Sequence, residues 1–231
     1  MALNKNQTRL ILIFAGLFVL PTLFWYVLTT GKNQFRTLPI IGPWQLATTS
    51  TNGIPDTIYH TIPEFSFTDW TGKTVTNRTL DSSIYVADFF FTTCKTICPK
   101  MSEGMYSLAY RYKDDSIVKF ISYTVDPETD SVEVLKAYAN KYQARPGKWF
   151  LVTGDKKELY ELARTGYLLP VAPGDGGADD FIHSEMLVLV DNKKHIRGYF
   201  DGTDKYEVDS LKDAIKLLKY EWIREQAGLK P

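Results

Sequence analysis

The chain has few cysteines: its 231 residues include only two, Cys94 and Cys98. Two thiols are too few for the disulfide framework of a small secreted domain. They are also too few for a structural zinc site made only of thiolates. Whatever chemistry the pair performs is therefore local to one short segment.

Acidic residues are absent from residues 1–50, which hold four Lys or Arg. Residues 51–231 hold 23 basic and 27 acidic residues, a net charge of −4. A nucleic-acid-binding domain needs a dense basic surface, so we expect no nucleic-acid partner. The composition, 44% hydrophobic and 23% charged, excludes a disordered or collagen-like chain and predicts a single folded domain.

One long hydrophobic run, residues 10–28, carries no charge. As a helix it spans ~28 Å, close to the thickness of a membrane hydrocarbon core. Trp25 and Tyr26 stand where interfacial aromatic residues belong. We therefore expect residues 1–30 to form an uncleaved membrane anchor with one transmembrane helix, while a cleaved signal peptide is the alternative.

The remaining sequence predicts a tether followed by an α/β domain. Residues 31–56 are rich in Pro, Gly, Thr and Ser, which is typical of a tether, and residues 57–231 are expected to be the domain. The alternation of strand-like and helix-like runs predicts one mixed sheet flanked by helices. The expected strands are 59–68, 84–91, 118–125, 149–152, 186–190 and 196–201, and the expected helices are 99–113, 132–141, 156–165 and a last one that includes Val208, Leu211, Ile215, Leu218 and Trp222.

The two cysteines follow an apolar strand and precede Pro99, which suits the first turn of a helix. Thiols at a helix N-terminus are stabilised as thiolates, the form that binds metals and attacks disulfides. Their spacing of four residues lets them chelate one ion or form a strained disulfide. A structural disulfide and two unpaired core cysteines remain alternatives.

The cysteine segment and several motifs around it resemble the Sco (SenC/PrrC) proteins, membrane-anchored copper proteins with a thioredoxin-like fold. The resemblance covers roughly 150 residues and implies that fold, a mixed sheet flanked by helices. The motifs that carry it are PEFSFTD at 63–69, FTTCKTICP at 91–99, TVDPETD at 124–130, LKAY at 135–138, Trp149 with Thr153-Gly154, and FIHS at 181–184.

The resemblance implies a copper site made of Cys94, Cys98 and His183. Two thiolates and an imidazole form a soft site that suits Cu(I), with Cu(II) left open. The chain departs from the family pattern at Lys95, Thr129 and Ile182. Ile182 stands where an acidic residue usually precedes the histidine, so the orientation of the imidazole is the property most affected.

Other candidate ligands are less convincing. His60 and His195 are expected to be solvated side chains. Met101 and Met105 could be soft auxiliary copper ligands, but we expect them to pack in the core.

Three acidic residues complete the candidate site. Asp88 interrupts an apolar strand six residues before Cys94, an offset similar to that of the buried aspartate of thioredoxins. A buried Asp88 would have a raised pKa and could accept a thiol proton, whereas an exposed edge position is the alternative. Asp126 and Asp130 are expected to cap the helix that begins near residue 131, with a place beside the metal site as the alternative.

These features lead to two hypotheses of different class. The first is a copper chaperone for the binuclear copper centre of a respiratory cytochrome oxidase, whose copper-bearing subunit, or another copper or thiol client, is the partner. The second is an enzyme, a thiol-disulfide oxidoreductase that uses Cys94, Cys98 and Asp88. A peroxidase ranks last, because no Arg lies between Arg78 and Arg111 to activate a cysteine. The expected location is a bacterial inner membrane, with the domain facing the periplasm or the outside.

Overall fold

The computed structural model describes residues 4–30, 37–51, 54–169 and 184–228. Contacts between residues divide the chain into two compact units, Met1–Arg36 and Thr37–Pro231. The larger unit contains both cysteines and therefore the candidate site.

The smaller unit is helical. It consists of α1 (Lys5–Phe14), a π-helical segment η1 (Ala15–Val19) and α2 (Leu20–Thr30). Within the described ranges, no helix combines the length and the apolarity needed to cross a bilayer. The membrane anchor expected for residues 1–30 stays a prediction.

The larger unit begins with an antiparallel hairpin, β1 (Trp44–Thr51) and β2 (Ile54–Tyr59). Trp44 lies opposite Tyr59 in its register. This hairpin forms a two-stranded sheet of its own and includes part of the segment expected as a tether. The threonines of β1 favour extended backbone, a signal that Pro and Gly in the same segment obscured.

The main sheet has seven strands in the order β4-β3-β7-β6-β5-β8-β9. β5, β6 and β7 run parallel, and the other neighbours pair antiparallel. The mixed sheet expected from the sequence is confirmed. The strands are β3 (Ser66–Asp69), β4 (Thr74–Thr76), β5 (Ile84–Phe90), β6 (Val118–Thr124), β7 (Trp149–Thr153), β8 (Met186–Val190) and β9 (Ile196–Asp201).

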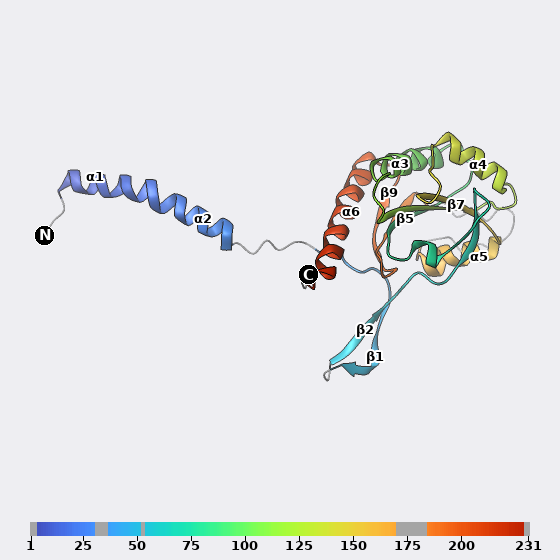
Figure 1. Cartoon of the computed structure of the whole chain (residues 1–231), viewed down its shortest axis with the longest axis horizontal. Coiled ribbons are helices and arrows are strands. Elements are labelled where there is room, and N and C mark those ends of the chain that lie inside the picture. Colours follow the sequence, from blue (N-terminus) through green and yellow to red (C-terminus); the bar gives the residue numbers. More distant parts are fainter. Residues whose placement is uncertain (1–3, 31–36, 52–53, 170–183, 229–231) are drawn as a thin grey trace. The chain divides into compact units, whose positions relative to one another are not determined.

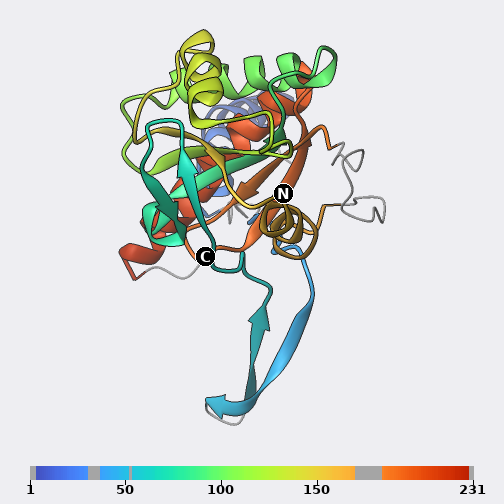
Figure 2. The ribbon, with the colours of Figure 1, turned by 90° about the vertical axis from the view of Figure 1, so that its right-hand side faces the viewer.

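Helices cover both faces of this sheet (Figure 1 and Figure 2). Side chains of α3, α4 and α6 pack on one face, and those of α5 and η3 pack on the other. The helices are η2 (Asn77–Leu80, a 3₁₀ turn), α3 (Ile97–Arg111), α4 (Val132–Lys141), α5 (Lys156–Glu161), its π-helical continuation η3 (Leu162–Gly166), and α6 (Lys205–Gln226).

The central strand β5 explains why the core has two halves. All seven of its residues are buried, as expected for a strand covered on both faces. Ile84, Val86 and Phe90 face α3 and α6, whereas Tyr85 and Phe89 face α5. Each such side chain stabilises the fold by about 1.5–3 kcal/mol through burial.

The parallel pairing of β5 and β6 also positions the site. Their register places Phe90 opposite Thr124, so both strands end at the same edge of the sheet. The connection from β5 to α3 and the connection from β6 to α4 therefore begin side by side. The cysteines lie in the first of these connections and the DPETD motif lies in the second.

Two differences from the expected elements have local causes. The extended run expected at 59–68 is divided, because β2 ends at Tyr59 and β3 begins at Ser66, with Pro63 between them. The helix expected at 156–165 changes from α to π hydrogen bonding at Leu162. The hairpin expected around residues 191–194 is confirmed as β8 and β9.

Candidate functional site

The two cysteines lie on a turn and on the helix that follows it. A turn closes where the Cys94 N–H donates to the Phe91 carbonyl over 3.3 Å. Thr96 is the N-cap of α3, so Cys94 precedes the helix and Cys98 lies in its first turn. Cys94 is half-buried and Cys98 is buried, and both are free thiols.

The sequence of α3 explains why the second cysteine points inward. Cys98, Met101, Met105 and Leu108 recur at spacings of three, four and three, which gives the helix one apolar face. All four pack in the core between α3 and the sheet. Pro99 is tolerated because a backbone N–H in the first helical turn has no carbonyl partner within the helix.

Hydrogen bonds make the Cys94 sulfur the more acidic thiol. The backbone N–H of Cys98 donates to Cys94 Sγ over 3.4 Å, and Thr96 Oγ1 lies 3.7 Å from the same sulfur. Partial burial raises the pKa of the Cys94 thiol, but hydrogen bonds from Cys98 and Thr96 outweigh it and lower the pKa to about 7. A large fraction of Cys94 is therefore thiolate at neutral pH.

Cys98 has the opposite character. Burial, with smaller contributions from the neighbouring Cys94 and Asp88, raises the pKa of its thiol to about 12, although a hydrogen bond with the Phe91 backbone opposes the rise. The protonated form of Cys98 therefore dominates at neutral pH when no metal is bound. The pair consists of one reactive thiolate and one shielded thiol.

Asp88 lies on β5 and is buried, so the exposed-edge alternative is wrong. Its alternation with Val86 and Phe90 turns it toward α3, the face on which Cys98 lies. Ser122 Oγ donates to Asp88 Oδ1 over 2.5 Å, and Trp149 Nε1 donates to Ser122 Oγ over 2.9 Å. Burial raises the pKa of Asp88 to about 7 despite the Ser122 hydrogen bond, so its carboxyl group can exchange a proton at neutral pH.

Neither Asp126 nor Asp130 is the N-cap of α4, so the prediction that they cap this helix is wrong. The N-cap is Ser131, whose side chain accepts a hydrogen bond from the Val134 N–H. Asp130 is fully buried and accepts hydrogen bonds from Thr92 and Thr124. Burial raises the pKa of Asp130, and those hydrogen bonds oppose the rise. Sequence reasoning missed this contact because it joins two connections 38 residues apart.

His183, the expected imidazole ligand, lies outside the described residues. The same holds for Ile182. Among the residues that are described, no group of three or more His, Cys, Asp or Glu could hold a metal ion. The described part of the candidate site is therefore the thiol pair.

The other two histidines are not the solvated side chains that the sequence predicted. His60 Nε2 lies 2.7 Å from the Gly166 carbonyl, so His60 joins the start of the domain to η3. His195 Nδ1 lies 3.4 Å from Asp191 Oδ2, and the His195 ring contacts Tyr59 edge-on. Both side chains are partly buried and make these contacts within the domain.

Met101 and Met105 are fully buried in the core, as expected. Their sulfurs fill the space between α3 and the sheet, the usual role of flexible apolar side chains. The copper-ligand alternative for these two residues loses its support.

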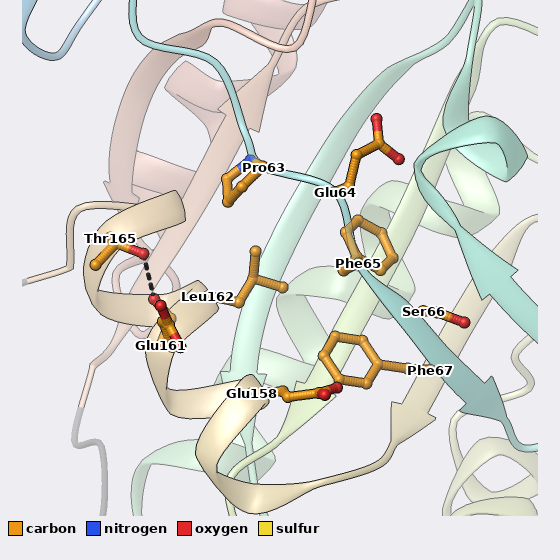
Figure 3. Close-up of a pocket in the computed structure, with 9 residues that line it drawn as sticks. All are labelled: Pro63, Glu64, Phe65, Ser66, Phe67, Glu158, Glu161, Leu162 and Thr165. Carbon is orange, nitrogen blue, oxygen red and sulfur yellow. Dashed lines mark hydrogen bonds between the residues drawn. The ribbon is translucent and has the colours of Figure 1, made fainter.

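A groove of about 550 Å³ lies elsewhere, between the segment before β3 and helix α5 (Figure 3). Its floor is apolar, and Glu64, Glu158 and Glu161 stand among its lining residues. Neither cysteine lines it. The thiol chemistry is therefore separate from this hollow of the surface.

Comparisons with known proteins show which family this chain resembles. A family model described as SCO1/SenC matches residues 55–218. A curated relative, a SCO1 protein homolog of Bacillus subtilis (strain 168), is 31% identical over 165 residues, which cover 71% of this chain and 85% of the relative.

Solved structures show the same mixed α/β, thioredoxin-like fold. A SCO1/SenC family lipoprotein from Bacillus anthracis str. Ames has a TM-score of 0.62 at 28% identity, covering 69% of this chain and 95% of that one. BsSco, a member of the Sco family of cytochrome c oxidase assembly proteins in which a disulfide switch is identified, has a TM-score of 0.59 at 30% identity, covering 69% and 93%.

A third structure contains the metal that the family resemblance implies. Arabidopsis thaliana ScoI with copper bound has a TM-score of 0.55 at 26% identity, covering 68% of this chain and 98% of that one. Because the family model matches well over half of the residues and the fold agrees, the chain belongs to the SCO1/SenC family.

Proposed function

We propose that this protein is a membrane-anchored copper chaperone. It binds Cu(I) through Cys94, Cys98 and His183 and serves the assembly of the binuclear copper site of a respiratory cytochrome oxidase. The observation that carries the proposal is the thiol pair at the N-terminus of α3, on a chain of the SCO1/SenC family.

The chemistry of the two thiols fits a soft metal ion. The pKa of Cys94 is lowered to about 7, so this ligand is available as a thiolate at neutral pH. The buried Cys98 thiol is protonated without metal, and a cation would replace that proton. Thiolate and imidazole donors favour Cu(I) over the hard ions that oxygen ligands bind.

The relatives support the metal and the pathway. Arabidopsis thaliana ScoI binds copper in its solved structure, and BsSco belongs to a family of cytochrome c oxidase assembly proteins. The partner that fits is the copper-bearing subunit of an oxidase, or another client with metal-binding thiols.

The proposed location is a bacterial inner membrane. Residues 1–30 would be a single-pass anchor, residues 31–56 a tether, and residues 57–231 a domain that faces the periplasm or the outside. The uncharged run at 10–28 supports the anchor. A relative described as a lipoprotein supports attachment to a membrane in the family, because a protein-bound lipid is itself an anchor.

The test is an anaerobic Cu(I) titration of the reduced full-length protein in detergent, against a competing chelator. We expect one tightly bound Cu(I). Cys94→Ser, Cys98→Ser and His183→Ala should each weaken Cu(I) binding by more than about 100-fold. Loss of a residue that only hydrogen-bonds a metal ligand costs roughly 10–100-fold, and loss of a ligand itself should cost more. His195→Gln is the matched control, because it removes an imidazole outside the proposed site.

Failure would be unambiguous. A wild-type protein that cannot compete with a modest chelator excludes a chaperone of Cu(I). If only His183→Ala binds as tightly as wild type, the two thiols remain ligands and the imidazole does not.

A second candidate function, thiol-disulfide oxidoreductase, is favoured by Asp88. Cys94 thiolate would attack a client disulfide and release one client thiolate. Cys98 would lose its proton to the Asp88 carboxylate and attack Cys94 Sγ, releasing the second client sulfur as a thiolate and leaving a Cys94–Cys98 disulfide. A buried carboxyl group with a pKa of about 7 suits that proton transfer, and BsSco contains a disulfide switch.

The same proteins distinguish the two functions. A chaperone should keep its Cu(I) affinity in Asp88→Asn, because the Asp88 carboxylate hydrogen-bonds Ser122 and holds neither cysteine. An oxidoreductase without copper affinity should instead reduce a client disulfide, and Asp88→Asn should slow that reduction, as measured by client thiol release.

A further inference from the structure

We propose that Asp130 is a positioning residue for the thiol site. Its carboxylate holds the turn that carries Cys94 against the end of β6, and so keeps Cys94 at the N-terminus of α3. The inference deepens the proposed function, since it concerns the same two thiols, but its geometry does not depend on copper.

The contacts of Asp130 join two chain segments. Asp130 Oδ1 accepts the Thr92 hydroxyl over 2.5 Å, and Oδ2 accepts the Thr124 hydroxyl over 2.5 Å. The backbone N–H of Thr92 also donates to Oδ2 over 3.2 Å. One carboxylate therefore ties Thr92, the second residue beyond β5, to Thr124, the last residue of β6.

Burial makes this link strong. Asp130 and Thr124 are both fully buried, so water does not compete for the hydrogen bond between them, and the two Thr92 hydrogen bonds to the same carboxylate are partly buried. A buried carboxylate without donors would be costly, and three donors compensate for its burial. Removing Asp130 leaves the Thr92 N–H and two hydroxyl groups without their acceptor.

The link reaches Cys94 through the backbone. Thr92 is the second residue of the turn that the Cys94 N–H closes onto Phe91. Holding Thr92 therefore fixes the direction in which Cys94 leaves the turn. That direction brings Cys94 Sγ to 3.4 Å from the Cys98 N–H.

A second contact holds the other side of the motif. Ser102 on α3 hydrogen-bonds Tyr138 on α4 over 2.8 Å, one turn beyond Cys98. The β6–α4 region thus makes two contacts around the cysteines. Asp130 contacts the turn that precedes them, and Tyr138 contacts α3 beyond them. The Asp130 contact is the one on the side of Cys94, the cysteine that precedes the helix.

The test compares Asp130→Ala, Thr92→Val and Thr92→Ser in the full-length protein. Thr92→Val removes the hydroxyl hydrogen bond and keeps the shape of the side chain, whereas Thr92→Ser retains the bond. Glu128→Ala is the matched control, because Glu128 lies in the same connection and is exposed. The readouts are amide hydrogen exchange of residues 91–98, Cu(I) affinity and the urea midpoint.

We expect faster exchange across residues 91–98 and a loss of about tenfold or more in Cu(I) affinity for Asp130→Ala and Thr92→Val. Thr92→Ser and Glu128→Ala should match wild type. A lower urea midpoint with unchanged exchange and Cu(I) affinity would make Asp130 a stabilising residue only, and would overturn the proposal. Should Asp130→Ala fail to fold, Thr92→Val and Thr92→Ser decide between these outcomes.

The experiment separates this inference from the proposed function. If the wild-type protein binds no Cu(I), the chaperone proposal fails while hydrogen exchange still reports on the turn. If Cu(I) binds tightly and no variant changes the exchange or the affinity, the positioning role fails while the chaperone proposal stands.

Discussion

At the scale of single residues, the two thiols differ because their surroundings differ. Cys94 is half-exposed and accepts backbone hydrogen bonds at a helix N-terminus, which stabilise its thiolate. Cys98 is buried among apolar side chains four residues later, where a charge is costly. This asymmetry suits both a metal ligand pair and a thiol pair with one attacking sulfur.

The asymmetry predicts a pH dependence. In metal-free Cys98→Ser, alkylation of Cys94 by iodoacetamide should rise with pH and reach half its maximum near pH 7, rather than near the ordinary thiol value of about 8.5. The rate falls below pH 7 because the thiolate is lost. In Cys94→Ser, Cys98 should stay almost unreactive up to pH 9. An inflection for Cys94 at 8.5 or above contradicts the proposed role of the backbone hydrogen bonds.

At the scale of elements, the site is a product of helix and strand packing. The face of α3 that carries Cys98 packs on β5 and β6, and α6 covers the same face of the sheet beside α3. Gly104 permits this approach: a Cβ there would lie 3.3 Å from a side-chain carbon of Val208 on α6. The position of Cys98 therefore depends on the packing of the two helices.

Truncation of α6 should measure that packing. Leu211 is fully buried, so Leu211→Ala should lower the free energy of unfolding by about 2–5 kcal/mol, through lost burial and the cavity left behind. Tyr206→Ala is the control, because Tyr206 on the same helix is 82% exposed and should cost far less. Urea unfolding followed by circular dichroism provides the measurement. Equal losses in the two variants would mean that α6 is not held by its apolar face.

At the scale of the whole domain, a buried ion network attaches the entering chain to the end of the fold. Arg197 on β9 donates to the carbonyls of Leu38 and Pro39 and to the carboxylates of Asp191 and Glu221. These contacts lie beside the amino end of β5, because Val190 at the end of β8 pairs with Tyr85 near the start of β5 and with Ile196 at the start of β9. The chain therefore enters the domain beside the amino end of β5, whereas the cysteines follow the carboxyl end of that strand.

The network should matter more than a surface ion pair. Arg197→Met leaves two enclosed carboxylates without their cation, and should lower the free energy of unfolding by about 3–5 kcal/mol. Lys193→Met is the control: its pair with Glu225 is about half-exposed and should contribute at most about 1 kcal/mol. Urea unfolding of the full-length protein would measure both losses. Equal effects would show that the Arg197 network is screened by water.

Much of the fold follows from local patterns. The apolar run of β5, the spacing of Cys98, Met101 and Met105, and the turn between β8 and β9 each reflect interactions between residues near in sequence. Asp88 was recognisable for the same reason, since a carboxyl group stands out in an apolar strand. The DPETD motif is also recognisable in the sequence, but the contacts of Asp130 with Thr92 and Thr124 are not.

The thiol motif, its place between strand and helix, and the family resemblance can all be predicted from the sequence, because they depend on the order and type of neighbouring residues. The tertiary structure adds that Asp130 holds Thr92, that Ser122 hydrogen-bonds Asp88, that His60 contacts Gly166 and that His195 contacts Tyr59. These contacts join residues far apart in the chain. Their existence depends on strand register and helix packing, which no local pattern specifies.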